Sequence, residues 1–421
     1  MARIVITSWG SYGDLNPYLG LALALKARGH TPLLATASHY KELIEGEGID
    51  FAPVRPDIDV TDVELVRRAM DARKGPEVVI RETVAPAVED SYADLTQAVH
   101  GADLLISHVI TFAAPIIAQV TGMPWLSTVL APTSFFSIHD FPVLPPASWL
   151  KSLEALGTWP NRLLFALARQ MTYGWTEPVR KLRARLGLPR GGDPIYEGQH
   201  SPRGVLGLFP SVLAQPQPDW PPNTRVTGAI VHDVAHGRGL GEEIEAFLAN
   251  GPAPVVFTLG SAAVLMGDAF YEESAKAVAT LGCRALLLVG DERARQLQPT
   301  LPEGMLAVGA APHSLLFPRA KAVVHHCGIG TLSQSLRAGR PLLGVPYSHD
   351  QPDNAWRAAQ LGVARVVAST DYRAARVVRE LRALMDDPQF ERAAAAVAQR
   401  VLPEDGPRNA CDAIERVLAA G

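Results

Sequence analysis

Cysteine is scarce in this sequence, with only Cys283, Cys327 and Cys411 among 421 residues and no C-x-x-C pair. This odd, sparse count argues against a disulfide framework or a zinc knuckle and is typical of a reducing compartment. Apolar runs are also short, since the stretch 19–25 is far below the roughly 18 to 20 residues that span a bilayer. No charged leader precedes a long apolar segment, so we expect a cytoplasmic protein with no signal peptide and no transmembrane segment.

Charged residues are few, at 19% of the chain, and the net charge of -4 comes without an evident basic stripe or run of like charge. A nucleic-acid-binding surface is therefore not expected. Hydrophobic residues make up 48%, which is too much for a disordered chain and enough to fill two cores. A chain of 421 residues is too long for one ordinary core, so we expect two domains of roughly 200 residues each.

Two signatures of nucleotide-binding enzymes are missing. The chain has no G-x-x-x-x-G-K-[ST] loop, and its first strand–helix turn lacks the G-x-G-x-x-G spacing of nicotinamide-binding proteins. The spacing Asp57-x-Asp59 matches metal-dependent sugar transferases, but it lies in a proline-rich loop and not at the end of a buried strand. Neighbours in the run 325–327 (His-His-Cys) point to opposite faces of a strand and are not expected to converge on one ion. We therefore expect neither a metal site nor a cofactor.

Short β-branched runs alternate with helical segments along the chain, which indicates parallel sheets covered on both faces. The first helix is expected to have Asn16 as its cap and Pro17 as its first residue, and to end before Gly29. The fold class is α/β, with two doubly wound Rossmann-like domains facing across a cleft. The runs expected to form buried strands are 3–7, 32–36, 104–107, 126–130, 255–259, 286–289, 323–325 and 342–345.

The strand–helix rhythm breaks at the proline-rich stretch 215–223, so we expect domains at 1–214 and 237–421 joined by a linker at 215–236. The sequence leaves open whether the last helix packs back on the first domain. The stretch 147–175 is helical and rich in aromatic residues. Two interpretations of it are open, a helical pair packed on the first domain and a wall or lid of an apolar pocket.

The strongest chemical signal is Val-His-His-Cys-Gly-Ile-Gly-Thr at 324–331, where a strand passes through a glycine-containing turn into a helix. Gly328 and Gly330 let the backbone approach a ligand, and the free N–H groups of the helix start favour an anion. Thr331 adds a hydroxyl donor and His326 a ring donor. The pattern predicts a diphosphate site, and an ordinary strand–helix turn is the alternative.

Two aspartates, Asp350 and Asp14, each follow a predicted strand, where a carboxylate can reach a bound ligand. Asp350 stands beside Gln351 one strand after the glycine turn, where such a pair can clamp hydroxyls of a sugar ring, although the pair alone is also typical of a helix cap. Asp14 lies in the first strand–helix turn, two residues before Asn16, and is therefore not needed as the cap. It is expected to face the cleft and to accept a proton from an alcohol, with a solvated turn residue as the alternative.

Together these motifs resemble the inverting, nucleotide-sugar-dependent glycosyltransferases of the GT-B fold, a family of antibiotic, macrolide, sterol and plant secondary-metabolite enzymes. The resemblance covers nearly the whole chain and is most specific in 310–364. There 311–316, 326–331 and 349–354 stand in the family's order and spacing. The stretch 200–205 is most similar to the bacterial branch that contains the rhamnolipid rhamnosyltransferase.

The resemblance implies that the first domain binds the acceptor and the second the nucleotide sugar. Asp14 stands where this branch carries its catalytic carboxylate and where plant members carry a histidine. The residues implied to bind the donor are Ser261, His326, Gly328, Gly330 and Thr331 at the phosphates, Ala311 and His313 at the base, Gln334 at the ribose, and Asp350 and Gln351 at the sugar. The acceptor pocket is expected to include His108, Phe135, Phe136, His139 and Trp149.

The chain departs from the family at two positions. Ala310 stands where plant members stack a tryptophan on uracil, and Gln334 stands where many members bind the ribose with a glutamate. Both departures leave the nucleotide open between uridine and thymidine. His108 stands where plant members have an aspartate that supports their catalytic histidine, a support that Asp14 does not require.

We therefore predict a metal-independent transferase that moves a hexose to a hydroxyl of a small lipophilic acceptor such as a phenolic, a flavonoid, a terpenoid or a hydroxy-lipid. The expected donor is UDP-glucose, and dTDP-rhamnose is the alternative. In the expected direct displacement, Asp14 deprotonates the acceptor and the anomeric configuration is inverted. A non-catalytic donor-binding helper and a sugar-nucleotide epimerase of the same fold are the competing hypotheses, and the oligomeric state is open.

Overall fold

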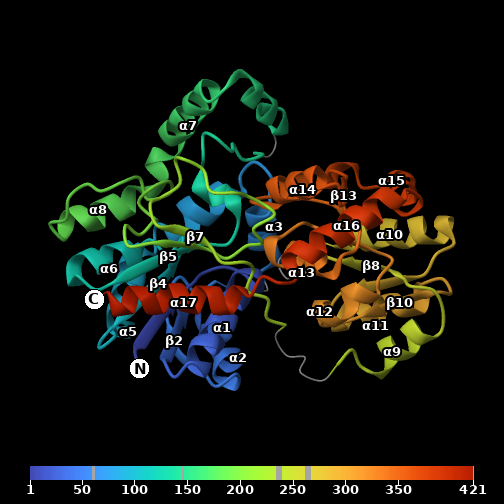
Figure 1. Cartoon of the computed structure of the whole chain (residues 1–421), viewed down its shortest axis with the longest axis horizontal. Coiled ribbons are helices and arrows are strands. Elements are labelled where there is room, and N and C mark those ends of the chain that lie inside the picture. Colours follow the sequence, from blue (N-terminus) through green and yellow to red (C-terminus); the bar gives the residue numbers. More distant parts are fainter. Residues whose placement is uncertain (59–61, 145–146, 234–238, 261–266, 421) are drawn as a thin grey trace. The chain divides into compact units, whose positions relative to one another are not determined.

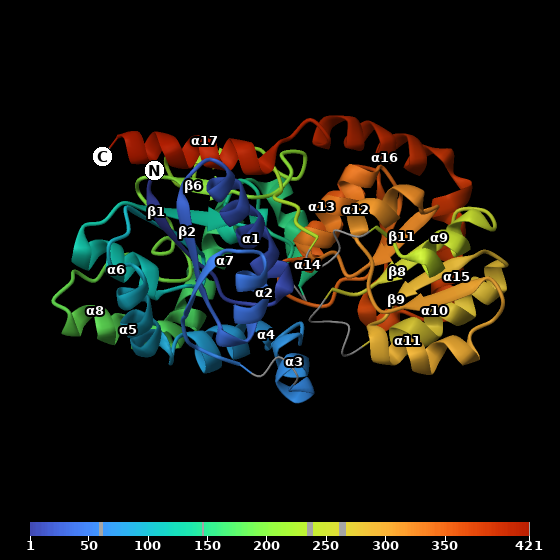
Figure 2. The same cartoon turned by 90° about the horizontal axis from the view of Figure 1, so that it is seen from below.

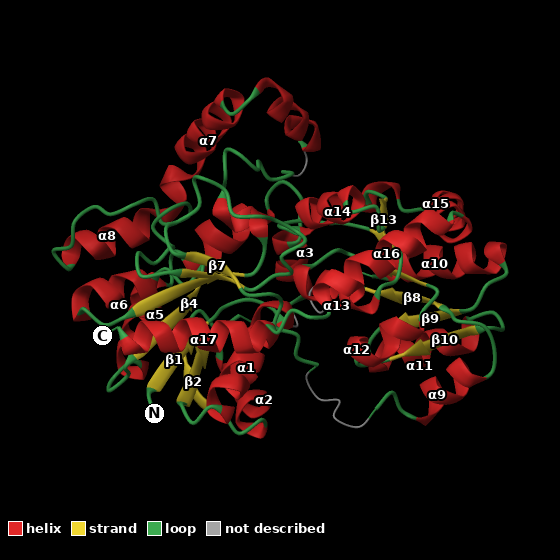
Figure 3. Cartoon of the chain, viewed as in Figure 1, coloured by secondary structure: helices red, strands yellow, loops and turns green. Residues whose placement is uncertain are grey.

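The computed structural model describes residues 1–420 except 59–61, 145–146, 234–238 and 261–266. Its contacts divide the chain into two compact units. The first unit comprises 1–62, 73–232 and 404–421, and the second comprises 63–72 and 233–403. Each unit is a parallel sheet with helices packed on it (Figures 1 and 3).

The first unit is built on a seven-stranded parallel sheet in the order β3-β2-β1-β4-β5-β6-β7. Its strands are β1 (Arg3–Thr7), β2 (Thr31–Thr36), β3 (Asp50–Pro53), β4 (Leu104–His108), β5 (Trp125–Val129), β6 (Val205–Gly207) and β7 (Thr224–Val226). Its principal helices are α1 (Tyr12–Ala27), α2 (Lys41–Gly46), α4 (Gly75–Glu77), α5 (Val88–Ala98), α6 (Ala113–Thr121), α7 (Trp159–Thr172), α8 (Glu177–Arg185) and α17 (Gly406–Ala419).

The second unit has a six-stranded parallel sheet in the order β10-β9-β8-β11-β12-β13. Its strands are β8 (Val255–Thr258), β9 (Ala285–Leu288), β10 (Met305–Val308), β11 (Ala322–His325), β12 (Leu342–Gly344) and β13 (Ala364–Val366). Its helices are α3 (Val63–Ala69), α9 (Glu242–Ala249), α10 (Asp268–Leu281), α11 (Asp291–Leu297), α12 (His313–Leu316), α13 (Ile329–Ala338), α14 (Gln351–Gln360), α15 (Ala374–Asp386) and α16 (Pro388–Val401).

Both sheets are buried on two faces, as the near-continuous apolar runs predict. In β8 the side chains of Val255 and Phe257 enter one core cluster, while Val256 enters the cluster on the opposite face. All four residues of β8 are buried. This is the pattern of a parallel strand covered by helices on both sides, so the α/β doubly wound fold class is confirmed.

Strand order also locates where a ligand site is expected in each unit. The central strand is β1 in the first sheet and β8 in the second. In each sheet the next strands are added on one side of it, and the chain then returns to its other side. The strand order therefore reverses between β1 and β4 and between β8 and β11. The register sets Thr7 beside Ser107 in the first sheet and Thr258 beside His325 in the second. Loops that leave the carboxyl ends of these four strands flank a switch point, where open α/β sheets bind ligands.

The predicted start of the first helix is wrong. The helix begins at Tyr12, and its cap is Ser11, whose hydroxyl accepts a hydrogen bond from the Gly13 N–H. Asp14 completes a capping box by accepting from the Ser11 backbone N–H at 2.8 Å. Pro17 therefore lies inside the helix, where its ring removes one backbone hydrogen bond. The pattern Ser-x-x-Asp at 11–14 was the local signal for this start.

The predicted linker also differs from the structure. Trp220 is buried and stacks on Phe135 with their ring centroids 3.9 Å apart. Thr224–Val226 pairs with β6 as the edge strand β7. The prolines do prevent a central strand, but they allow turns followed by an edge strand, so the first unit extends to residue 232.

The last helix, α17, belongs to the first unit and lies along α1 (Figures 1 and 2). Arg28 at the end of α1 forms ion pairs with Asp412 at 2.6 Å and Glu415 at 2.9 Å. Asn409 donates a hydrogen bond to the Thr227 carbonyl at 2.9 Å. None of the helices within the described ranges is long and apolar enough to cross a membrane.

Candidate active site

In the second unit, His326 occupies a narrow space between two glycine-containing turns at the switch point. Its Nδ1 accepts a hydrogen bond from the Gly260 N–H, at 3.0 Å. A Cβ at Gly260 would lie 2.5 Å from the imidazole, and a Cβ at Gly328 would lie 2.3 Å from Nε2. Only glycine at both positions therefore leaves room for this ring and for access to its Nε2.

The protonation of His326 follows from its surroundings. Burial is the main cause that lowers its pKa to about 4, and the charge of His313 makes a smaller contribution to the same shift. The ring is therefore neutral near pH 7, and because Nδ1 accepts a hydrogen bond from the Gly260 N–H, the ring proton is on Nε2. His326 thus presents one N–H donor at the carboxyl end of β11.

Beside this donor, α13 begins with unused backbone N–H groups. Its cap is Gly328, which has no side chain to accept a hydrogen bond from the first turn, and no acidic side chain lies in that turn. A Cβ on Gly330 would meet no described atom within 4 Å, so the space next to the helix start is open. Thr331 contributes its hydroxyl in the same turn. Free N–H groups at a helix start, with open space beside them, favour an anion such as phosphate.

The neighbouring His325 has a different task. It is fully buried, its Nδ1 accepts from the Cys327 N–H at 3.0 Å, and its Nε2 lies 3.2 Å from the Ser335 hydroxyl. His325 therefore holds the turn in shape. The two adjacent rings have separate partners, as the strand alternation predicts.

The residues expected at the nucleoside lie along the same edge of the second sheet. Gln334 follows one turn after the start of α13, and its side-chain oxygen is buried without a hydrogen-bond partner. His313 stacks on Phe317 with centroids 4.4 Å apart, and Ala311 is buried in the adjacent core cluster. The orphaned amide oxygen of Gln334 is the kind of group that a bound hydroxyl would satisfy. Ser261 lies outside the described residues.

The pair Asp350 and Gln351 stands at the start of α14. Asp350 occupies the cap position, but its side chain does not bond to the helix backbone; its Oδ2 instead accepts from Asn354 at 2.6 Å. The Gln351 Oε1 accepts from the N–H groups of Tyr347 at 2.9 Å and Ser348 at 3.3 Å. Because the oxygen of Gln351 is committed to the backbone, a ligand meets the amide through its NH₂ group.

A segment from the first half of the chain supports this loop. Residues 63–72 belong to the second unit, where Met70 is buried in the core and Val66 packs against the same cluster. We call these ten residues the strap. Sequence patterning gave no sign of it, because its membership of the second unit depends on where Met70 packs and not on any local periodicity.

The strap contacts the residues immediately before the sugar-binding pair. The ring Nε2 of His349 donates to the Ala69 carbonyl at 2.8 Å, and the Ser348 hydroxyl donates to the Asp71 carbonyl at 3.1 Å. His349 adopts a left-handed backbone conformation with φ at 57°, which is uncommon for a residue with a side chain. The strap therefore helps to fix the loop that presents Asp350.

In the first unit, Asp14 lies at the corresponding switch point, after β1. Its Oδ2 accepts from the Ser11 N–H at 2.8 Å and the Ser11 hydroxyl at 3.1 Å. A Cβ on Gly10 would lie 2.3 Å from this oxygen, so the carboxylate needs glycine at that position. The other oxygen, Oδ1, accepts no hydrogen bond from the described residues. Asp14 is thus not the cap residue, which is Ser11, but one of its oxygens takes part in the capping box. The other oxygen remains for a substrate.

His108, at the end of β4, is within electrostatic reach of Asp14. Burial lowers the pKa of His108, and the negative charge of Asp14 offsets part of that effect. The ring packs edge-on against Tyr18, and its Nδ1 has no hydrogen-bond partner. Tyr18 in turn lies 2.5 Å from the Thr128 hydroxyl. The structure thus brings Asp14, Tyr18 and His108 together at the β1/β4 switch point.

The other side chains expected in the acceptor pocket differ in burial and in what they contact. Phe135 is buried in an aromatic cluster with Trp220, and Phe136 packs against Tyr196. His139 is exposed, and 66% of Trp149 is exposed. Their role in binding an acceptor stays a prediction.

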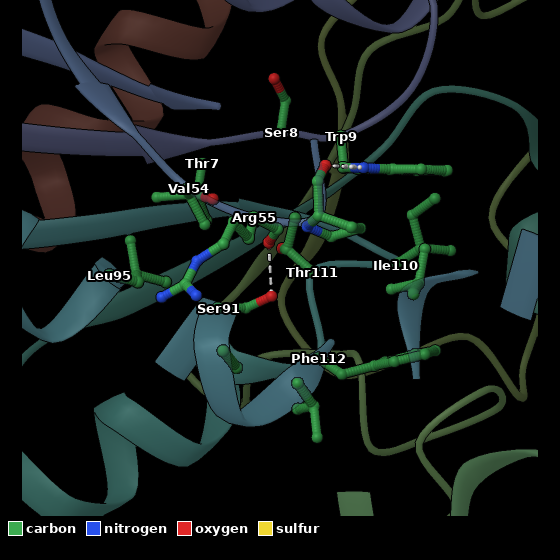
Figure 4. Close-up of a pocket in the computed structure, with 14 residues that line it drawn as sticks. Thr7, Ser8, Trp9, Val54, Arg55, Ser91, Leu95, Ile110, Thr111 and Phe112 are labelled. Carbon is green, nitrogen blue, oxygen red and sulfur yellow. Dashed lines mark hydrogen bonds between the residues drawn. The ribbon is translucent and has the colours of Figure 1, made fainter. Parts of the chain in front are cut away.

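A small cavity lies behind Trp9, at the end of β1 (Figure 4). Its volume is about 20 Å³, enough for one water molecule and too small for an acceptor. Thr7 and Ser8 line it, and both hydroxyl oxygens lack a partner among the described residues. Trp9 Nε1 donates to the Pro56 carbonyl at 2.9 Å and forms part of the wall.

The aspartate pair that resembles a metal motif is only partly described. Asp57 accepts from the N–H and the hydroxyl of Ser38, at 2.6 and 2.8 Å, so it supports a short turn. Asp59 lies outside the described residues. Among the residues that the structure places, no group of three or more His, Cys, Asp or Glu side chains is arranged to hold a metal ion.

Comparison with known proteins gives consistent matches. Residues 275–417 match the family model described as "Erythromycin biosynthesis protein CIII-like, C-terminal domain". The chain is 32% identical to O-mycaminosyltylonolide 6-deoxyallosyltransferase of Streptomyces fradiae, over 98% of this chain and 97% of the relative. It is 27% identical to a sterol 3-beta-glucosyltransferase of Emericella nidulans, over 99% of this chain but only 30% of that longer protein.

Solved structures show the same fold. The glycosyltransferase VinC, in a complex with dTDP, superposes with a TM-score of 0.68 and 21% identity, covering the whole of both chains. This likeness confirms the predicted GT-B fold, and the curated relatives confirm the predicted resemblance to antibiotic and sterol glycosyltransferases.

Proposed function

Because the chain belongs to the glycosyltransferase family that includes O-mycaminosyltylonolide 6-deoxyallosyltransferase, we propose that it transfers a deoxyhexose from a dTDP-linked donor to a hydroxyl of a small lipophilic acceptor. The first unit supplies the base and the second unit binds the donor. The observation that carries the proposal is the pairing of a neutral imidazole N–H donor with a helix start that has no capping side chain, at the β8/β11 switch point.

In the proposed reaction the departing group is stabilised by the second unit. As the bond between the anomeric carbon and the phosphate oxygen breaks, that oxygen keeps the electron pair and the diphosphate gains charge. The Nε2–H of His326 and the N–H groups at the start of α13 are aimed at such an anion. Stabilisation of this kind requires no divalent metal.

The acceptor oxygen is activated in the first unit. The Oδ1 of Asp14 takes the proton of the acceptor hydroxyl as that oxygen forms a bond to the anomeric carbon. Attack from the face opposite the diphosphate inverts the configuration. Ser11 holds the carboxylate through its other oxygen, so the free oxygen keeps a fixed direction.

The proposed nucleotide is thymidine diphosphate. Gln334 has one amide oxygen, which is buried and unpaired, whereas a glutamate at this position would offer two. A deoxyribose has one free hydroxyl at this edge, and a ribose has two. A single acceptor therefore suits the deoxyribose. VinC was crystallised with dTDP, which supports the same choice.

The proposed sugar is a deoxyhexose. Gln351 meets the sugar only as a donor, since its oxygen is bonded to the loop backbone. Without a free oxygen on Gln351, the site has one hydrogen-bond acceptor fewer for the hydroxyls of the sugar. Such a site selects less strongly for a full set of hydroxyls, which suits a sugar that lacks one hydroxyl. Glucose from UDP-glucose is the second candidate, favoured by the match to a sterol 3-beta-glucosyltransferase.

Thermal shift with dTDP, UDP and their sugars tests the nucleotide directly, because a ligand of the native state raises the melting temperature. We expect dTDP to stabilise the chain more than UDP, and Gln334→Glu to reverse that order. A variant with unchanged preference would show that Gln334 does not contact the ribose. Transfer of label from the stabilising donor to a panel of lipophilic alcohols then tests the reaction itself.

A further inference from the structure

The hairpin of the first unit is formed by the 3₁₀ helix η4 (Ser148–Leu156), α7 and the start of the 3₁₀ helix η5 (Tyr173–Thr176), and it exposes many large apolar side chains. Seven of its large apolar side chains are at least 46% exposed. They are Trp149, Leu156, Trp159, Leu163, Leu167, Met171 and Tyr173. The other large exposed apolar side chains among the described residues are scattered along the chain, at 1, 12, 63, 120, 186, 315, 366 and 402. We call the seven the outer stripe.

The stripe is a property of α7 itself. Trp159, Leu163, Leu167 and Met171 recur every fourth residue and therefore share one side of the helix. The opposite side buries Phe165 against the first unit's core. A helix that is apolar on two sides is normally surrounded by protein or lipid, yet only one side of α7 is covered.

The hairpin is held firmly against the first unit, so the stripe is preformed. The buried amino group of Lys151 donates to the Phe141 carbonyl at 2.6 Å and pairs with Glu154 at 2.9 Å and Asp140 at 3.2 Å. Asn161 donates to the Ile138 carbonyl at 2.9 Å. In Figure 1 the hairpin stands out from the rest of the first unit.

Positive charge flanks the stripe, in contrast to the whole chain. Residues 148–190 hold eight Lys and Arg but only two Glu, whereas the net charge of the chain is -4. Lys151 and Arg183 are buried, and three more form ion pairs, Arg169 with Glu197, Lys181 with Glu177 and Arg185 with Glu89. The cations that remain are Arg162, Arg180 and Arg190. Arg162 is exposed on α7 and makes no ion pair with any described residue. Arg180 and Arg190 lie over the ring of Tyr173, at 3.8 and 5.8 Å from its centroid.

We propose that the outer stripe docks the first unit onto an anionic lipid surface. Indole and phenol rings beside leucine, with arginines at the margin, are the composition of helices that lie in the headgroup region of a bilayer. Surface ion pairs such as Arg169 with Glu197 are weak and are readily exchanged for lipid phosphate. Docking would bring the first unit, which supplies the proposed base, to a surface where lipophilic alcohols collect.

A protein partner is less well suited to this surface. A stable protein interface uses about 20 to 30 residues a side, far more than the seven side chains of the stripe. A bilayer needs only one helix face, inserted to a depth of about 5 to 10 Å.

Co-sedimentation of the full chain with vesicles tests the proposal. We expect binding to phosphatidylcholine vesicles that contain phosphatidylglycerol, little binding to pure phosphatidylcholine, and release by salt. The double variant Trp159→Ser/Leu163→Ser should lose at least about tenfold in partition. The single variant Arg162→Ser should lose about fivefold. The matched controls are Val120→Ser, exposed on α6, and Lys41→Ser, exposed on α2, and both should bind as the unaltered chain does.

Three results would overturn the proposal. The first is that anionic vesicles do not sediment the unaltered chain, or sediment the double variant equally well. The second is a dimer in solution that the double variant converts to a monomer, which would assign the stripe to a second copy. The third is a raised KM for a water-soluble acceptor without vesicles, with vesicle binding unchanged, which would make the stripe an acceptor wall. The variant Trp159→Phe/Leu163→Ile, which keeps the apolar surface, should retain binding and guards against a folding defect.

Discussion

Replacing Asp14 by asparagine separates two tasks that its carboxylate performs. One oxygen completes the capping box with Ser11, and the other is available as a base. An amide oxygen still accepts from the Ser11 N–H, so Asp14→Asn keeps the helix start while removing the proton acceptor. General-base removal lowers rates by about 10²- to 10⁴-fold. At 1.36 kcal/mol for each tenfold, this is roughly 3 to 5 kcal/mol of barrier.

The matched control is Ser11→Ala, which removes the cap and leaves the base. Without the Ser11 hydroxyl, the Gly13 N–H loses its hydrogen-bond acceptor and the Asp14 carboxylate loses one hydrogen-bond donor. Such a loss costs about 0.5 to 2 kcal/mol of stability. For a domain of this size it lowers the melting temperature by about 2 to 4 °C for each kcal/mol.

The assay is initial-rate transfer to an alcohol, together with a thermal melt of each variant. Asp14→Asn should lose rate and keep its melting temperature, whereas Ser11→Ala should lose melting temperature and keep most of its rate. The rate loss of Asp14→Asn should shrink for an acidic phenol, which is already partly ionised. If Asp14→Asn kept full rate on an alcohol, or if Ser11→Ala lost as much rate, Asp14 would be a helix cap and not a base.

Four further predictions follow from the second unit and from buried histidines. Transfer should survive excess EDTA, and activity restored only by Mn²⁺ or Mg²⁺ would contradict stabilisation of the diphosphate by His326 and the start of α13. Asp350→Ala should greatly reduce turnover and leave affinity for the free nucleoside diphosphate nearly intact; an equal loss of both would make the residue structural. Met70→Ser should loosen the strap and reduce kcat more than nucleotide affinity, whereas Val63→Ser, on an exposed side of the same segment, should change neither. Burial lowers the pKa of His326 and His200 to about 4, so both stay neutral in the folded chain while the unfolded chain takes up protons near 6.5. Stability is therefore complete above pH 6.5 and falls as the pH drops from 6.5 toward 4, and His200→Gln should flatten that slope in thermal melts.

The fold could be predicted because its strands carry a strong signal. All eight predicted strands are present, since a buried parallel strand requires an apolar run. The strands that escaped prediction include β6, β7 and β13, each of three residues. The four-residue strands β3 and β10 were missed as well, whereas β12, also of three residues, was predicted from its apolar run. Length alone therefore does not decide the outcome, and the pairing of a short strand depends on its neighbour.

The candidate site was also predictable only in part. His326 and the turn at 328–331 were predictable, because the glycine spacing and the following helix are local features. The hydrogen bonds from the loop backbone to the Gln351 oxygen were not predictable, because they depend on side-chain geometry. The strap was hidden for a similar reason, since nothing in the sequence of 63–72 links it to residues near 349.

In the proposed reaction Asp14 activates a hydroxyl for direct displacement of a nucleoside diphosphate. The most direct test is the anomeric configuration of the product, read from the proton NMR coupling of the glycoside formed from a donor of known configuration. Direct displacement predicts that the product has the opposite configuration to the donor. Asp14→Asn should form the same product at least about a hundredfold more slowly than the unaltered chain. A product that retains the donor's configuration would contradict it.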